Sequence, residues 1–437
     1  MLFSGRPPQE MSQDSLLRNT SWLTLISGVE RVAGVVQTVL IARALGITAY
    51  GVYGLIFGTI GLTASIAGLQ MGLTATVFLA RYRDTEKSKA AFVIAFVNRY
   101  GCAVALLFLL GSIPYVGPIS TWLIGISGSE MPIVAGCLLV AFSIISGIQE
   151  GVIQGFEDFR SLAFARLVTT FVTLACIYPA SVEFGLLGAM AVVLLGMLVK
   201  YVMLTRKLGA HIRNNNLPKK GEGLLGRELM WGFSLPSTLV SLLAGAIGWG
   251  GTFVLSRQTH GFDALAIVNT GLQWRGPIFL LTTAVSSVAI PAISRHYQAA
   301  NHTAIGQMHR KVILFNGAFA LVTSATLMAI SPLILPLYGP GFADGTLVFS
   351  LLVASAVPQV IAGVYLQHLV AKGQMWQQLC LHLWLVVPLG IGFATLIPRF
   401  HGEGFALVNF VAWGIFATAL VLSARTAPRL STNAPIG

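Results

Sequence analysis

The chain alternates between long apolar stretches and short polar segments. An apolar run of about 20 residues is long enough to cross the roughly 30 Å hydrocarbon core of a bilayer as an α-helix. The pattern predicts twelve such helices, at about 20–43, 51–80, 90–113, 131–154, 161–181, 184–205, 229–255, 263–293, 311–331, 346–371, 377–397 and 402–424. We therefore expect an all-α protein that crosses a membrane many times.

The longest polar segment, RKLGAHIRNNNLPKKGEGLLGRE, separates the sixth predicted helix from the seventh. It divides the chain into two six-helix bundles, 20–205 and 229–424, joined by a linker over 206–228. Short polar segments flank the bundles at 1–19 and 425–437. Six crossings return the chain to the side from which it started, so the linker and both ends are expected on one face.

The two bundles repeat one another weakly. VLIARALGITAYG aligns with VLSRQTHGFDALA, which places Arg43 on Arg257, and GLLGA (185–189) matches GEGFA (402–406). The matches occur in the same order at nearly the same spacing, which indicates an internal duplication. Two halves with the same orientation are related by a pseudo-two-fold axis along the membrane normal, an arrangement suited to rocking around a central cavity.

Composition and charge support this topology. Of the 437 residues 55% are hydrophobic and 10% are charged, whereas a soluble domain carries about 25% charge. Twenty-one Lys and Arg residues fall on the side of the two chain ends, and three (Arg43, Arg257 and Arg399) fall on the other. This bias predicts cytoplasmic termini in a bacterial inner membrane. The net charge of +12 lies in short loops, so we expect no nucleic-acid partner.

The sequence offers no cofactor or metal motif. The four cysteines stand singly inside apolar runs, and no CxxC pair occurs. A GxxxxGK[ST] phosphate loop is absent, which argues against an ATP-driven pump. We expect no cofactor, and the sequence leaves open whether a proton or Na⁺ accompanies the cargo.

Charged residues inside three predicted helices are the candidate functional groups. A charge at the bilayer centre costs about 2.5 to 3.5 kcal/mol on insertion scales, so each should face protein or water. The first helix carries a polar face at helical spacing, in which Glu30 and Arg31 are joined by Gln37. Arg99 lies in the third helix and Arg275 in the eighth.

Carboxamides accompany two of these arginines: Asn98 precedes Arg99, and Asn269 and Gln273 precede Arg275. One interpretation is that these groups line a wet cavity that binds an anionic head group, with Glu30 as counter-charge. The other is that the arginines are neutralised structurally, for instance by a pair between Glu30 and Arg99, and bind nothing. Glu150, near the inner end of the fourth helix, is expected to be solvated.

Four short motifs carry a resemblance to a known family: LGITAYGVY (45–53), GFSLP (232–236), IPAISR (290–295) and LYGPGF (337–342). In this order over twelve helices they resemble the polysaccharide flippases (Wzx-type) of the multidrug/oligosaccharidyl-lipid/polysaccharide (MOP) superfamily, which have a MATE-like fold. The sequence departs from that pattern where Ile47 replaces a proline. It departs again where the seventh helix lacks an acidic residue.

The resemblance implies a function. Such a flippase moves a polyprenyl-diphosphate-linked oligosaccharide from the cytoplasmic to the outer face by alternating access, for O-antigen, exopolysaccharide or capsule biosynthesis. Its partners would be membrane lipids and the polymerase and glycosyltransferases of the same pathway. Arginine suits the diphosphate because it stays charged and presents a planar fork of donors. The turn at 45–53 is expected to be structural, with Gly46 and Gly51 allowing tight backbone geometry and Tyr50 and Tyr53 in the interfacial belt.

Two alternatives remain open. An ion-coupled multidrug antiporter of the MATE type has the same span count, but it needs acidic groups in the cavity, and the deep charges here are mainly positive. A membrane polysaccharide polymerase or glycosyltransferase would carry its chemistry on a long outer loop or on paired aspartates. The outer loops are all under about 20 residues, and the acidic pair Glu157–Asp158 lies beside Arg160 in an inner loop. We therefore expect a transporter and not an enzyme.

Overall fold

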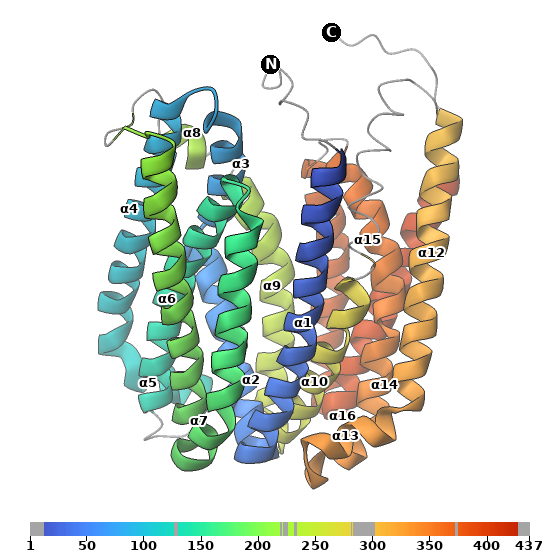
Figure 1. The fold of residues 1–437 in the computed structure, drawn as a ribbon. Coiled ribbons are helices and arrows are strands. Elements are labelled where there is room, and N and C mark those ends of the chain that lie inside the picture. The colour runs from blue at the N-terminus through green and yellow to red at the C-terminus, as the bar shows by residue number, and fades with distance from the viewer. Residues whose placement is uncertain are drawn as a thin grey trace.

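The computed structural model describes residues 13–125, 130–218, 221, 226–230, 234–280, 282, 302–371 and 375–426. Over these residues the chain is almost entirely helical and contains no strand. The helices run roughly parallel or antiparallel in one bundle (Figure 1). The prediction of an all-α multi-pass membrane protein is therefore confirmed.

The N-terminal half consists of α1 (Gln13–Leu45), α2 (Ile47–Ala67), α3 (Met71–Tyr82), α4 (Lys87–Ser112), η1 (Ile113–Tyr115), α5 (Val116–Leu123), α6 (Glu130–Gly155) and α7 (Phe159–Asn214). The C-terminal half consists of α8 (Gly226–Leu229), α9 (Leu235–Ser256), α10 (Gly261–Trp274), α12 (His302–Ala329), α13 (Ser331–Tyr338), η3 (Pro340–Gly345), α14 (Thr346–Ala354), α15 (Ala356–Ala371) and α16 (Met375–Thr426). Helix α7 continues through Asn214, so the predicted linker is helical over 206–214.

Within the described part of the chain, seven helical segments are long and apolar enough to cross a membrane. Two of them, in α7 and α16, contain 56 and 44 residues, about twice the length that one crossing needs. Each folds back on itself at a residue with positive φ, Gly185 (φ 58°) and His401 (φ 47°). These two turns account for four of the predicted crossings. The predicted span 51–80 is the pair α2 and α3, which is interrupted between Ala67 and Met71.

Backbone geometry supports the internal repeat. At Gly188 a Cβ atom would overlap the carbonyl oxygen of Ala180, and at Gly404 it would overlap the carbonyl oxygen of Leu396. Both glycines therefore let the returning leg of a folded-back helix approach the first leg closely. The two pairs are 216 residues apart, one fewer than the sequence match had indicated.

The first and last described residues, Gln13 and Thr426, lie at the same end of the bundle, at the top of Figure 1. We call this the terminal end. The fold-back turns of α7 and α16 lie at the opposite end, here called the distal end. The arrangement is the one expected for a chain that crosses a membrane an even number of times.

The two halves meet tightly at the distal end, where the turn between α1 and α2 contacts α10 and α13. A Cβ on Gly51 would overlap the backbone of Phe262, so only glycine permits this approach. Tyr50 and Tyr53 are 3% and 8% exposed, and the Tyr50 ring lies 6.3 Å from that of Tyr338. Placement of these tyrosines in a lipid-facing interfacial belt was wrong, because they pack in the contact between the halves.

Polar contacts join the halves as well. At the distal end the Thr48 hydroxyl donates to the Asp263 carboxylate over 2.5 Å. Toward the terminal end the Gln70 amide donates to the Ser241 hydroxyl over 3.2 Å. Thus a side-chain hydrogen bond links α9 to the junction of α2 with α3, whereas the distal contact is mainly apolar and aromatic.

Within the N-terminal half, glycines bring α3 and α6 into close contact. Three of them, Gly147, Gly151 and Gly155, stand at four-residue intervals on α6. A Cβ on Gly151 would overlap the backbone of Gly72 on α3. Small residues at this spacing let helix backbones approach closely within a membrane. The contact fixes the position of α6, which carries several of the polar side chains described below.

Replacing Gly151 with alanine is therefore expected to lower the thermal stability of the purified protein, by about 1 to 3 kcal/mol, as is usual for an overpacked contact. Gly147→Ala is the matched control, because a Cβ at Gly147 has no atom within 4 Å. Thermal melting in detergent compares the two variants. Equal melting temperatures for Gly151→Ala and the control would contradict the close packing of α3 on α6.

Candidate functional site

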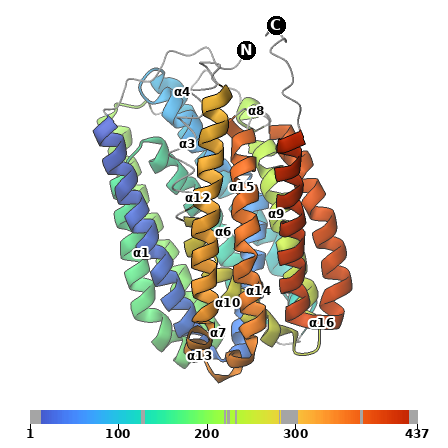
Figure 2. The same ribbon diagram turned by 90° about the vertical axis from the view of Figure 1, so that its right-hand side faces the viewer.

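Helix α1 carries two adjacent charges that point to different halves of the molecule. The Glu30 carboxylate lies 3.7 Å from the guanidinium of Arg166 on α7, which runs beside α1 (Figure 2). The Arg31 guanidinium instead lies against Gly276, just beyond α10, where its Nη1 atom would be 2.8 Å from an added Cβ. The pair recognised in the sequence is thus split, with Glu30 facing the N-terminal half and Arg31 the C-terminal half.

Arg275, which immediately precedes Gly276, is held by neutral groups. Its Nη1 atom donates to the Ser355 hydroxyl over 2.9 Å, at the junction of α14 and α15. The guanidinium carbon lies 5.9 Å from the centre of the Phe279 ring. Its Nε atom is buried and has no hydrogen-bond partner. No carboxylate of the described residues forms an ion pair with Arg275.

Carboxamides surround this pair of arginines. The Gln273 side-chain nitrogen lies 3.3 Å from where a Cβ on Gly34 would stand, so it meets α1 one turn from Arg31. The Asn269 amide nitrogen is buried against Gly54 of α2 and has no hydrogen-bond partner. Gln37 is partly buried on the same helix as Arg31. Arg31 and Gln273 therefore lie in the contact between α1 and the end of α10, next to Arg275, whereas Asn269 lies farther along α10 against α2.

A hydrogen-bonded cluster closes the distal side of this region. The Trp274 indole nitrogen donates to the Tyr338 hydroxyl over 3.0 Å. The same hydroxyl lies 3.3 Å from that of Thr38 on α1. Tyr338 is fully buried, so these two interactions close the interface between the halves on the distal side of Arg31 and Arg275.

The arrangement has the electrostatic character of an anion site. Arg31, like Arg275, has no ion-pair partner among the residues that the structure describes. Two guanidinium groups of this kind, with neutral hydrogen-bonding side chains beside them, favour an anionic ligand that several donors can reach at once.

The structure does not bring Arg99 and Asn98 to this region. Arg99 is exposed on α4, which lies at the left edge of Figure 1, well apart from α1 and α10. The Asn98 carboxamide oxygen accepts a hydrogen bond of 2.8 Å from the buried Gln149 on α6. Asn98 is therefore a structural residue of the N-terminal half. The suggested pair between Glu30 and Arg99 was also wrong, because Glu30 pairs with Arg166.

Sequence reasoning missed a cluster of four charges. Glu150 on α6 accepts from Arg166 over 2.6 Å and from Lys200 over 2.6 Å, and both cations belong to α7. Glu30 on α1 completes the cluster through Arg166. Its two acids and two bases balance, so the cluster is neutral overall. The expectation that Glu150 is solvated was wrong, since its side chain is only 17% exposed.

One signal in the sequence pointed to this cluster. Lys200 stands in MLVKYVML and Arg166 in FARLV, each between apolar residues. Both stand within the predicted helices 161–181 and 184–205, but they were counted with the cations on the side of the chain ends and not as charges inside a helix. The bias of Lys and Arg toward the terminal end remains strong without them.

Comparison with known proteins adds a family and a fold. The family model described as polysaccharide biosynthesis protein matches residues 16–297. The EPS I polysaccharide export inner membrane protein EpsE of Ralstonia solanacearum is 23% identical over 202 residues, 45% of this chain and 46% of that protein. The match thus spans about half the length of this relative.

Solved structures of similar fold are transporters. An inward-facing multidrug resistance MATE family transporter of the MOP superfamily superposes with a TM-score of 0.75 at 15% identity, over 94% of this chain and all of the other. A MOP superfamily transporter from Pyrococcus furiosus gives 0.67 at 17% identity, over 94% of each chain. An outward-facing MATE transporter gives 0.65 at 17% identity, again over 94% of each. At these identities the likeness establishes the fold, and the molecule is closer to the inward-facing structure.

Proposed function

Because the chain belongs to the polysaccharide biosynthesis protein family, we propose that it is a flippase for a polyprenyl-diphosphate-linked oligosaccharide. It moves this lipid from the cytoplasmic to the outer face of the bacterial inner membrane by alternating access between its two halves. The family match and the transporter fold favour this function over that of a polymerase or glycosyltransferase.

The observation that carries the proposal is that Arg31 and Arg275 lie on either side of the contact between α1 and α10 and that neither forms an ion pair with a carboxylate of the described residues. A bare diphosphate in a medium of low dielectric constant costs far more free energy than thermal motion supplies. The exposed guanidinium of Arg31 and the buried guanidinium of Arg275 offset this cost, because charge-assisted hydrogen bonds to phosphate are about twice as strong as neutral ones. A cationic drug would be repelled by the same pair.

The terminal end is assigned to the cytoplasm in this proposal. The excess of Lys and Arg at that end supports the assignment through the positive-inside rule. The closer likeness to the inward-facing transporter is consistent with it, since the halves are joined by apolar packing at the distal end. The cargo would then enter from the terminal end.

The membrane potential supplies the direction of transport. Each negative charge that moves outward across 100 mV yields about 2.3 kcal/mol, so the two charges of a diphosphate yield about 4 to 5 kcal/mol. The proposal therefore requires no cofactor and no coupled proton or Na⁺. The lipid-linked product would be consumed by a polymerase, after glycosyltransferases have assembled it, in the synthesis of O-antigen, exopolysaccharide or capsule.

The test is flipping in proteoliposomes that contain the purified chain. A prenyl-diphosphate-linked oligosaccharide is distributed over both leaflets, and an impermeant lectin is added outside. The protein is expected to make the whole pool accessible to the lectin, whereas protein-free vesicles expose about half. An accessible fraction of half in vesicles with folded protein would exclude flipping. Uptake of ethidium by such vesicles would instead favour a cation exporter.

A further inference from the structure

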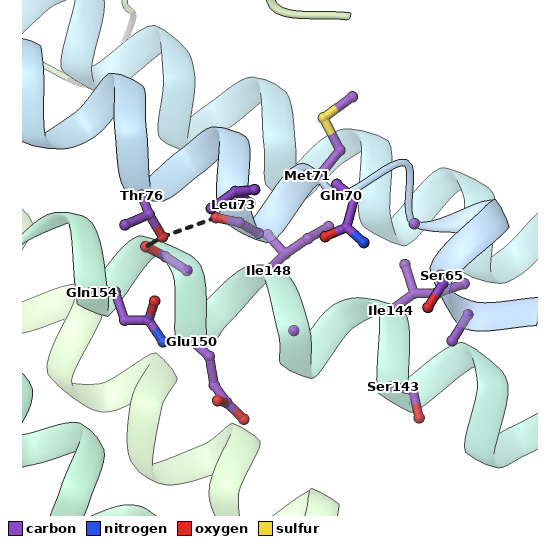
Figure 3. A pocket seen from close by; sticks show the side chains of 15 residues that line it. Ser65, Gln70, Met71, Leu73, Thr76, Ser143, Ile144, Ile148, Glu150 and Gln154 are labelled. Atoms are coloured by element: carbon purple, nitrogen blue, oxygen red, sulfur yellow. Dashed lines mark hydrogen bonds between the residues drawn. The ribbon is translucent and has the colours of Figure 1, made fainter. Parts of the chain in front are cut away.

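A second polar cavity, separate from the paired arginines, lies within the N-terminal half. It has a volume of about 360 Å³ and lies between α6 and the junction of α2 with α3 (Figure 3). Its polar lining consists of Ser65, Gln70, Thr76, Ser143, Glu150 and Gln154. Ligand sites in proteins occupy about 300 to 1,000 Å³, so the cavity has the size of a small-molecule site.

Several polar groups of the cavity are available to a ligand. Neither the Ser65 hydroxyl nor the Gln154 carboxamide has a hydrogen-bond partner among the described residues. The Gln70 amide nitrogen donates to the Ser241 hydroxyl, but no described residue donates to the carboxamide oxygen of Gln70. These three residues are partly exposed, so their free donors and acceptors are accessible to water or to a polar ligand.

The backbone at the cavity is irregular. Leu69 and Gln70 have φ of 44° and 49°, and they interrupt the predicted span between α2 and α3. Irregular backbone at membrane depth is tolerated where it is buried in protein or lines a water-filled cavity. The interruption turns the Gln70 side chain toward the other half of the molecule, where it reaches Ser241 on α9.

The charge of the cavity differs from that of the paired arginines. Its one charged lining residue, Glu150, is already neutralised by Arg166 and Lys200. The lining therefore offers hydroxyl, carboxamide and compensated carboxylate groups, together with the apolar side chains of Ile144 and Ile148. This combination suits a ligand with many hydroxyl groups and an apolar ring face. It provides no attraction for a phosphate.

We propose that this cavity is a carbohydrate subsite that binds a sugar ring of the cargo while Arg31 and Arg275 bind its diphosphate. The inference rests on the proposed function, because the sugar belongs to the same lipid-linked molecule. The hydroxyls of the ring hydrogen-bond to Ser65, Gln70 and Gln154, and its apolar face packs against α6. The sugar and the diphosphate of the cargo thereby bind at two different places in the protein.

The test compares two probes on the purified full chain in detergent. One is a short-chain prenyl diphosphate that carries a hexose disaccharide, and the other is the same prenyl diphosphate without sugar. The wild type is expected to bind the glycosylated probe more tightly. The double substitution Ser65→Ala with Gln154→Met is expected to weaken that binding about tenfold, equivalent to about 1.4 kcal/mol, and to leave the bare probe unchanged. Arg31→Ala is expected to weaken both probes.

Gln258→Met is the matched control, because the Gln258 carboxamide bonds to the Val254 carbonyl at the distal end, outside the cavity. Each substitution is also measured singly, so the comparison stands if the double variant does not fold. A wild type without preference for the glycosylated probe would overturn the subsite, as would variants that bind both probes like the wild type or lose both equally. A wild type that binds neither probe would overturn the proposed cargo itself.

Discussion

Arg275→Met is expected to abolish polysaccharide export and, at the same time, to raise the thermal stability of the protein. The guanidinium of Arg275 lies inside the bundle with a buried Nε atom that lacks a partner, and none of the described carboxylates pairs with it. Methionine fills a similar volume without the charge. Ser355 stays satisfied, because its hydroxyl also donates to the Leu352 carbonyl over 2.6 Å.

The expected sizes of the loss of export and of the gain in stability both follow from removal of the buried charge of Arg275. Removal of one partner of a buried charged pair costs about 2 to 5 kcal/mol of binding, so the affinity for a diphosphate lipid is expected to fall by about 30-fold or more. Stability is expected to rise by about 0.5 to 2 kcal/mol, as single stabilising substitutions commonly give. Surface polysaccharide, membrane abundance and thermal melting are the measurements. Arg275→Lys keeps the charge and is expected to retain part of the export.

Arg99→Met is the matched control, because the exposed Arg99 on α4 lies outside the site. It is expected to leave export unchanged. If Arg275→Met lowered the melting temperature and left export intact, Arg275 would be a structural residue. Loss of export with Arg99→Met at normal abundance would mean that the site is wrongly placed.

The architecture was largely predictable, because apolar length and turn chemistry are local properties of the sequence. The long apolar runs, the fold-back near Gly185 and its repeat near His401 all agree with the structure. The resemblance to the polysaccharide family is confirmed by the match over residues 16–297 and by the transporter fold. These properties do not depend on which face of a helix meets which neighbour.

The site was only partly predictable, because the direction of a side chain depends on helix packing. Arg31 and Arg275 are brought together by the contact between α1 and α10, which the sequence suggested by charge alone. Arg99 had the same kind of apolar surroundings and yet lies on α4, apart from the contact between α1 and α10. Lys200 stands inside the predicted helix 184–205 but was counted with the cations on the side of the chain ends, because its pairing with Glu150 depends on the packing of α6 against α7. Periodicity within one helix cannot decide between these outcomes.

Glu150→Leu is expected to be the most destabilising substitution in the N-terminal half. It would leave Arg166 and Lys200 with Glu30 as the one remaining acid of the cluster, at 3.7 Å from Arg166. Removal of one partner from a buried ion pair costs about 3 to 5 kcal/mol, because the remaining charge stays buried without compensation. The expected result is a large fall in membrane abundance and in the melting temperature of the purified protein.

The double substitution Glu150→Leu with Lys200→Leu removes one charge of each sign and leaves the pair of Glu30 with Arg166. It is expected to recover most of the lost stability, since replacing a buried ion pair by apolar side chains is often neutral. Glu183→Leu is the control, because Glu183 is exposed near the turn of α7 and belongs to no described ion pair. A double variant as unstable as Glu150→Leu alone would show that Glu150 stabilises the bundle by something other than charge balance. In that case charge balance within the cluster would not explain how α1, α6 and α7 accommodate four charged side chains between them.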